Sequence, residues 1–172
     1  MTAPVFVDTK VLLYARDAGE VAKQRRAATW LEYLWRERIG RTSVLVLSEY
    51  YVNVTRKLTP GLASEEAWDD VQALLTWHPQ PVDDALLRRG REIEARYRLS
   101  WWDSLVVAAA QLQGCAVLLT EDLQDGGVFG GVAVRSPFTL HLEEAAAAYA
   151  VAPGTARGHP SRGRPRGSRR AA

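Results

Sequence analysis

Four carboxylates in the chain stand where they could act together on a metal ion. Asp8, Glu49 and Asp122 each follow a short apolar run, and Asp103 begins a segment that is apolar nearly throughout. Carboxylates that are held close together repel one another unless they are protonated or neutralised. A hard divalent cation resolves this repulsion, and oxygen-only ligands favour Mg²⁺ or Mn²⁺ over zinc. We therefore expect these acids to form a metal site if the fold brings them together.

Such a site suits the hydrolysis of phosphodiester bonds. A bound metal lowers the pKa of a water ligand, orients that water and neutralises charge on the scissile phosphate. Asp8, Asp103 and Asp122 are the expected ligands, with Glu49 as a further ligand or as the general base. Hydroxyl side chains near these acids could orient carboxylates or waters, although they could equally cap the backbone. These hydroxyl residues are Thr9, Ser104 and Thr120.

Each acid also has an ordinary structural explanation. Asp8 could cap the helix that follows it, and Glu49 could favour a helix N-terminus. Asp103 could complete a capping box, and Asp122 could be a turn residue. These explanations account less well for all four acids lying next to apolar runs that would bury a sheet.

The elements that would position the acids alternate between strands and helices. Apolar runs at 5–7, 42–47, 116–120 and 132–134 predict buried strands, with a possible edge strand at 78–82. Helices are expected at 20–38, 50–58, 64–77, 83–97, 101–113 and 140–150, the first of them ended by Gly40. This alternation predicts a three-layer α/β/α fold with a central parallel sheet over about residues 1–140. Three of the acids would then lie at the carboxyl edge of the sheet, where ligands bind in such folds.

Composition and charge divide the chain into a domain and a tail. The 172 residues and 47% hydrophobic content predict one domain, which we place at 1–150, followed by a tail at 151–172. Since the formal net charge is +2 and the tail holds six arginines and no acid, residues 1–150 carry −4. The tail is rich in Gly, Pro and Arg and is predicted to be disordered. We expect no membrane span and no signal peptide, and the single Cys115 is expected to be buried in a reducing cytoplasm.

The acids and their flanking residues resemble the PIN domain, and within it the VapC-type toxins of bacterial toxin–antitoxin pairs. The resemblance covers about residues 4–138. The segments that carry it are 6–9, 48–58, 121–126 and 137–138.

This resemblance implies a Mg²⁺-dependent endoribonuclease. Its acidic quartet would be Asp8, Glu49, Asp103 and Asp122, with the helix that begins near Asp103 bringing that acid into the same cleft. The resemblance also implies a homodimer and a cognate antitoxin whose C-terminal segment blocks the cleft.

Two residues depart from the family pattern. Lys10 stands where the family usually has Asn, and an ammonium beside Asp8 could compete with the metal or bind a substrate phosphate. Asp125 stands where this branch often has His. It is either a fifth acid near the metal or, as the two glycines after it favour, an ordinary turn residue.

One helix face could hold the RNA strand. Glu49, Asn53, Arg56 and Lys57 have the spacing of a single helix face. Arg56 would lie about 10 Å along the helix from Glu49, at a distance that suits a neighbouring phosphate. The alternative is a solvated face, or an arginine paired with a carboxylate.

Two other classes of function compete with a ribonuclease toxin. An aspartyl-phosphate phosphatase would want a second Asp two residues after Asp8, where Lys10 stands. A catalytically weak binding module would use the acidic cleft to hold a cation or a basic partner segment. An acidic cleft alone does not separate this module from a nuclease.

Overall fold

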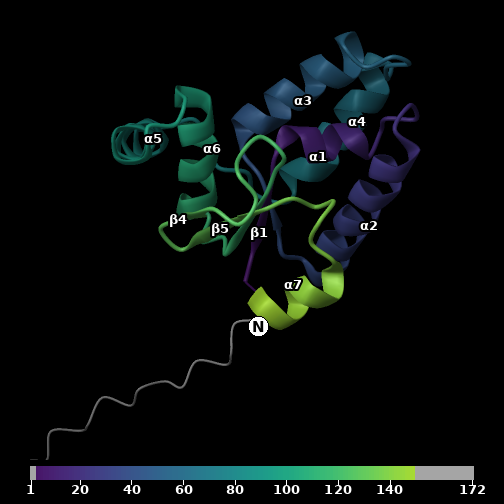
Figure 1. The fold of residues 1–172 in the computed structure, drawn as a ribbon. Helices are drawn as coiled ribbons and strands as arrows, with labels where there is room; N and C mark the ends of the chain where they lie inside the picture. Colours follow the sequence, from purple (N-terminus) through teal and green to yellow (C-terminus); the bar gives the residue numbers. More distant parts are fainter. Residues whose placement is uncertain (1–2, 150–172) are drawn as a thin grey trace, which may run out of the picture.

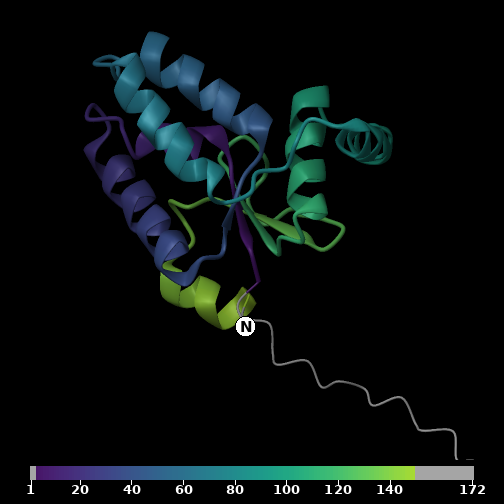
Figure 2. The same ribbon diagram turned by 180° about the vertical axis from the view of Figure 1, so that it is seen from behind.

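The structure of the protein is a computed structural model in which residues 3–149 are described. Within this range a five-stranded sheet runs through the molecule, and helices cover both of its faces (Figures 1 and 2). The strand order is β2-β1-β3-β5-β4, and all neighbouring pairs are parallel except β4 and β5. The predicted three-layer α/β/α fold with a central parallel sheet is confirmed. The strands are β1 (Val5–Val7), β2 (Gly40–Arg41), β3 (Val117–Leu119), β4 (Val128–Phe129) and β5 (Val132–Arg135).

The helices fall into two groups around the sheet. Helices α1 to α4 lie on one side, and α5 and α6 pack against each other on the other side (Figure 1). The tail at 151–172, predicted to be disordered, lies outside the described residues. The helices are α1 (Thr9–Tyr14), α2 (Val21–Glu37), α3 (Val44–Arg56), α4 (Ser64–Leu75), α5 (Asp84–Tyr97), α6 (Trp101–Leu112) and α7 (Leu142–Tyr149).

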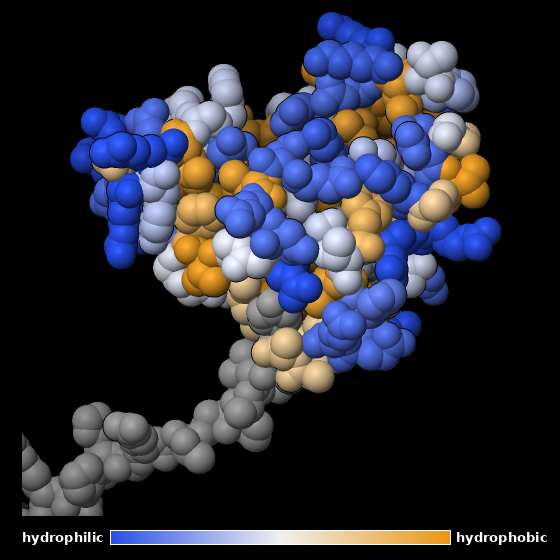
Figure 3. Space-filling model, viewed as in Figure 1, coloured by the Kyte–Doolittle hydropathy of each residue, from blue (hydrophilic) through white to orange (hydrophobic). Residues whose placement is uncertain are grey.

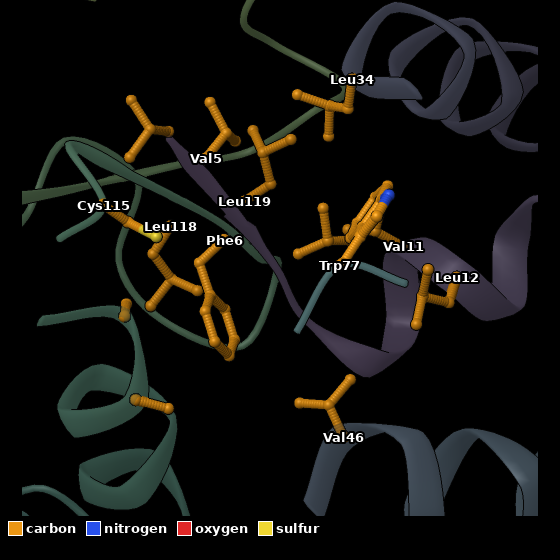
Figure 4. Packing of buried hydrophobic residues seen from close by; sticks show 14 of the residues in the cluster. Val5, Phe6, Val11, Leu12, Leu34, Val46, Trp77, Cys115, Leu118 and Leu119 are labelled. Atoms are coloured by element: carbon orange, nitrogen blue, oxygen red, sulfur yellow. The ribbon is translucent and has the colours of Figure 1, made fainter. Parts of the chain in front are cut away.

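Strands β1 and β3 form the middle of the core (Figure 4). Phe6, Leu118 and Leu119 are completely buried, because helices cover both faces of the sheet. Cys115 lies in the same cluster, and burial raises the pKa of its thiol to about 12. It is therefore a buried small hydrophobe, as predicted, and not a reactive thiol.

The register of β1 and β3 sets the position of the first acid. Val7 pairs with Leu119, so the next residues along each strand, Asp8 and Thr120, lie side by side. The backbone N–H of Asp8 also donates to the carbonyl of Leu119 at 3.1 Å. Both chain segments therefore leave the sheet at its carboxyl edge, at the place where α1 begins.

The predicted strand at 42–47 is wrong. The strand here is β2, only two residues long, and α3 already begins at Val44. Ser43 caps this helix, because its side-chain oxygen accepts a hydrogen bond from the backbone N–H of Val46 at 3.2 Å. Val46 and Leu47 are buried on the inner face of the helix. A short apolar run has the same pattern in a buried strand and in the buried first turns of a helix.

Gly40 has a different role from the one predicted. Helix α2 ends at Glu37, and its C-cap residue Arg38 adopts the left-handed conformation with φ 58°. Gly40 lies instead in β2, where a Cβ atom would come within 2.4 Å of the Trp77 ring. The predicted edge strand at 78–82 is reduced to one parallel bridge between Ser43 and Gln80.

Helix caps and close packing shape the two helices on the far side of the sheet. Asp83 and Ser100 cap α5 and α6. Gly90 permits close packing of these two helices, because a Cβ atom there would lie 2.7 Å from Leu105. Strand β4 was not predicted from the sequence. Among the described helices, none is long and apolar enough to cross a membrane, and the face seen in Figure 3 is mostly hydrophilic with separate apolar patches.

Candidate active site

Asp8 lies at the centre of the candidate site. It ends β1 and caps α1, and only 6% of the residue is exposed. One carboxylate oxygen accepts from the backbone N–H of Thr9, and the other accepts from the hydroxyl of Thr120, both at 2.8 Å. Desolvation by burial, and to a smaller extent the charges of Asp122 and Glu49, raises the pKa of Asp8 to about 6 against the opposing effect of these hydrogen bonds.

Glu49 reaches the site from α3. It lies in the second turn of this helix and not at its start, because the strand predicted before it is helical. The hydroxyl of Thr9 donates to the Glu49 carboxylate at 2.9 Å. Thr9 therefore contacts two acids, Asp8 through its backbone and Glu49 through its side chain.

Asp122 reaches the site from the segment after β3. Its backbone N–H donates to the hydroxyl of Thr120 at 3.0 Å, and that hydroxyl in turn donates to Asp8. The ammonium of Lys10 lies 2.5 Å from an Asp122 carboxylate oxygen. This hydrogen bond raises the pKa of Lys10. The ion pair is partly open to solvent, since the two side chains are 49% and 38% exposed.

Asp103 is held differently. Its carboxylate accepts from the hydroxyl of Ser100 at 2.8 Å, and its backbone N–H donates to the same hydroxyl at 3.1 Å. Ser100 therefore caps α6 through the Asp103 N–H, as in the predicted capping box, but the Asp103 carboxylate accepts from the Ser100 hydroxyl instead of its backbone N–H. Ser104 also makes a local contact, because its buried hydroxyl donates to the carbonyl of Ser100 at 2.7 Å. The capping interpretation therefore describes the contacts of both residues.

A cavity of about 410 Å³ lies between the first turns of α3 and α6. Glu49 lines it from α3, and Trp102, which is 69% exposed, lines it from α6. The rest of its lining is mostly apolar. Since Asp103 follows Trp102 directly, the end of α6 that carries Asp103 faces the side of the molecule where Glu49 lies. Sequence reasoning did not single out Trp102, although its position beside Asp103 could have indicated it.

The chemistry of the donor set fits a hard divalent cation, but the side chains do not form a ready-made cage. Asp8, Glu49 and Asp122 offer only oxygen atoms, which Mg²⁺ and Mn²⁺ prefer, and the last two are close enough to Asp8 to raise its pKa. Between residues 3 and 149, however, no three acidic, histidine or cysteine side chains are grouped closely enough to hold a metal. The cation that contacts this cluster in the structure is the ammonium of Lys10.

The substrate-binding residues predicted on α3 lie further from the acids. Asn53 lines a separate cavity of about 240 Å³ together with Lys57. Arg56 is the last residue of α3 and is exposed. The structure therefore places both on the expected helix but shows no contact between them and the acidic cluster.

Asp125 is a structural residue in this fold. It lies in a turn, and its carboxylate accepts from the Thr139 hydroxyl at 2.7 Å, the Ser136 backbone N–H at 2.9 Å and the Arg135 side chain at 3.1 Å. These hydrogen bonds, that of Thr139 first, lower the pKa of Asp125. The turn interpretation favoured from the sequence agrees with these contacts.

The parallel sheet and the carboxylates at its carboxyl edge define a class of α/β domains with an acidic site at this edge. The family model described as the PIN domain matches residues 5–124, and this chain belongs to that family. Comparison with curated proteins found no match.

Two solved structures have a similar fold. The chain described as "Structure of FitAB bound to IR36 DNA fragment" is 20% identical, with a TM-score of 0.63 over 80% of this chain and 97% of that chain. The "Toxin-antitoxin complex from Klebsiella pneumoniae" is 20% identical, with a TM-score of 0.56 over 78% of this chain and 98% of that chain. At this identity the likeness shows the fold.

Proposed function

We propose that this protein is a metal-dependent endoribonuclease and the VapC-type toxin of a toxin–antitoxin pair, with its nuclease domain at 1–150. The observation that carries the proposal is the buried Asp8 of a PIN domain, with Glu49 and Asp122 beside it at the sheet edge. The resemblance of segments 6–9, 48–58 and 121–126 to VapC toxins supports the narrower assignment.

Each acidic and hydroxyl residue of this site has its own role in the proposed reaction. Asp8, Glu49, Asp103 and Asp122 would hold Mg²⁺, or Mn²⁺, with Glu49 as ligand or as the base that accepts a proton from the attacking water. When bound, the metal supplies an activated water and neutralises charge on the phosphate. Thr9 and Thr120 orient the carboxylates, since their hydroxyls donate to Glu49 and Asp8.

The cavity beside Glu49 is where an unpaired base of the RNA would lie. Aromatic side chains stack on bases of single-stranded nucleic acid, and Trp102 is exposed at the rim of this cavity. Each stacked base contributes about 1–3 kcal/mol. The measurement is the affinity of the Asp8→Asn protein for a non-cleavable RNA. Adding Trp102→Ala to this protein should weaken that affinity about tenfold. Trp68→Ala, which removes another half-exposed tryptophan from α4, is the matched control. Equal effects of the two changes would contradict this placement.

An antitoxin and a second copy of the chain are the proposed protein partners, and the cytoplasm is the proposed location. The similar fold solved in a toxin–antitoxin complex supports the antitoxin. The acidic cleft suits a basic antitoxin segment, because Lys10 already shows a basic side chain seated on Asp122.

The test is cleavage of total cellular RNA by purified protein that has been freed of any bound partner. We expect discrete fragments with Mg²⁺ or Mn²⁺, none with EDTA and none with Asp8→Asn. The matched control is Asp69→Asn, which makes the same chemical change at an exposed position on α4 and should cleave like the parent protein. Absence of cleavage by a folded protein at every metal concentration would contradict the proposal.

That negative result would favour the second candidate function, a catalytically weak binding module. The observation in its favour is the ion pair between Lys10 and Asp122, in which one acid of the cluster pairs with a basic group. Such a module should bind its partner tightly, and Asp122→Asn should weaken that binding without any cleavage in either protein.

A further inference from the structure

We propose that Lys10 is a resident counter-ion of the acidic site, and that a divalent cation must displace its ammonium from Asp122 in order to bind there. The inference rests on the metal site of the proposed function. It concerns how the site is regulated, namely which cation holds the carboxylates together before metal binds.

The first support is the position of Lys10 in the fold. Lys10 is the second residue of α1, two positions after Asp8, and its ammonium contacts Asp122, which lies 112 residues further along the chain. The cap that Asp8 provides fixes the start of this helix. The Lys10 side chain therefore spans the edge of the sheet, from the start of α1 to the segment after β3.

The second support is the distribution of charge among the clustered acids. Within the part of the chain that the structure describes, Asp8 accepts only from the Thr9 backbone and the Thr120 hydroxyl, and Glu49 accepts from the Thr9 hydroxyl. Of these three carboxylates, Asp122 alone has an ion pair among the residues at 3–149. The Lys10 ammonium thus compensates the charge of Asp122, one member of a cluster in which neighbouring carboxylates repel one another.

The third support is accessibility. The Lys10 side chain is 49% exposed, so the ammonium can leave Asp122 for solvent without disturbing the core. A cation with two charges and an ammonium repel each other at the short distances at which both contact one carboxylate. Metal binding and the Lys10 contact therefore exclude each other, and the lysine lowers the affinity for metal.

The first experiment measures metal affinity by calorimetric titration of the full chain with Mn²⁺. Lys10→Met keeps the length of the side chain and removes its charge, and Lys10→Gln keeps a polar end. Both variants should bind Mn²⁺ more tightly by a factor of about five, because this factor corresponds to the free energy of one partly exposed ion pair. Arg25→Met is the control, because it removes the same charge from an exposed position on α2 and should leave the affinity unchanged.

The second experiment follows the lysine itself. The chain has three lysines, Lys10, Lys23 and Lys57, so selective ¹³C labelling of lysine Cε gives three signals that single substitutions assign. Addition of Mg²⁺ should shift the Lys10 signal toward its position in the Asp122→Asn variant. The Lys23 and Lys57 signals should stay in place.

An unchanged or weaker Mn²⁺ affinity in Lys10→Met, or a Lys10 signal that ignores Mg²⁺, would overturn the inference. These readouts do not depend on RNA cleavage. Tighter metal binding in the variant without cleavage by the parent protein would support the counter-ion and contradict the nuclease. Cleavage with unchanged metal affinity would support the nuclease and contradict the counter-ion.

Discussion

The acids of the candidate site are held in two different ways. Asp8, Glu49 and Asp122 come from three segments that are distant in the sequence, and two threonines connect them, Thr9 through its backbone and hydroxyl and Thr120 through its hydroxyl. Asp103 makes its side-chain hydrogen bond to Ser100, three residues earlier in its own helix cap. The first group is positioned by contacts between distant segments, whereas Asp103 is positioned by one helix turn. Among the described residues no hydrogen bond joins Asp103 to the other three acids, whereas Asp122 and Glu49 lie close enough to Asp8 to raise its pKa.

The largest expected effect comes from comparing Asp8 with Asp103 directly. Asp8→Asn and Asp103→Asn should each lower RNA cleavage by more than about 100-fold, beyond the 10–100-fold typical of groups that only support a ligand. Rates of cleavage of one end-labelled RNA at a fixed Mg²⁺ concentration measure this. If Asp103→Asn cleaves like the parent protein, Asp103 is only a capping residue and the acidic site has three members.

The second prediction concerns how the free energy of unfolding depends on pH when one of these acids is removed. The folded protein holds the pKa of Asp8 at about 6, above the 3.8 of the free side chain. The folded state therefore binds more protons than the unfolded state between about pH 4 and 6, and stability falls as pH rises through this window. With EDTA present, Asp8→Asn should gain stability relative to the parent protein over this range, reaching about 3 kcal/mol above pH 6.

Denaturant unfolding at several pH values measures that difference. Asp103→Asn is measured alongside it, as the variant of the acid that belongs to a helix cap. A stability difference for Asp8→Asn that does not change with pH would contradict a desolvated carboxyl group.

The smallest expected effects come from removing one hydroxyl from each group of acids. Thr120→Val removes the hydroxyl that joins Asp8 to Asp122 and should weaken Mn²⁺ binding about tenfold. Ser100→Ala removes the cap of Asp103 and should lower the free energy of unfolding by about 1 kcal/mol, with Mn²⁺ affinity nearly unchanged. Calorimetric titration and denaturant unfolding of both variants test the pair. Weaker Mn²⁺ binding in Ser100→Ala together with unchanged Mn²⁺ binding in Thr120→Val would contradict this assignment of the two hydroxyls.

Much of the sheet could be predicted because its central strands are short and apolar on both faces. The runs at 5–7 and 116–120 correspond to β1 and β3, and this placed Asp8 at a strand end. The run at 42–47 failed because its local pattern fits a strand or a buried helix equally well, and the cap at Ser43 decided the outcome. Strand β4 has only two residues, and its Val128 is 62% exposed, so it leaves no apolar pattern to find.

The contacts of the candidate site could likewise be predicted where they are local in the sequence and not where they join distant segments. The capping box at Ser100 and Asp103 is local, and the sequence indicated it. The pairing of Lys10 with Asp122 depends on the register between two strands that are far apart in the chain, so no local pattern reports it. The sequence indicated that the Lys10 ammonium could compete with a metal ion, but it did not indicate that Asp122 is the ion-pair partner of Lys10.

The order of strands in the sheet has a consequence for synthesis on the ribosome. Strand β1 is made first, yet one of its neighbours is β3, and the hydroxyl that holds Asp8 arrives 112 residues later. A nascent chain that stops before residue 116 carries Asp8 and Glu49 but lacks Thr120 and Asp122. Contacts of such long sequence separation form late in folding. Nascent chains that stop before β3 therefore lack two residues of the candidate site, and this site can assemble only after residue 122 has been made and β3 has paired with β1.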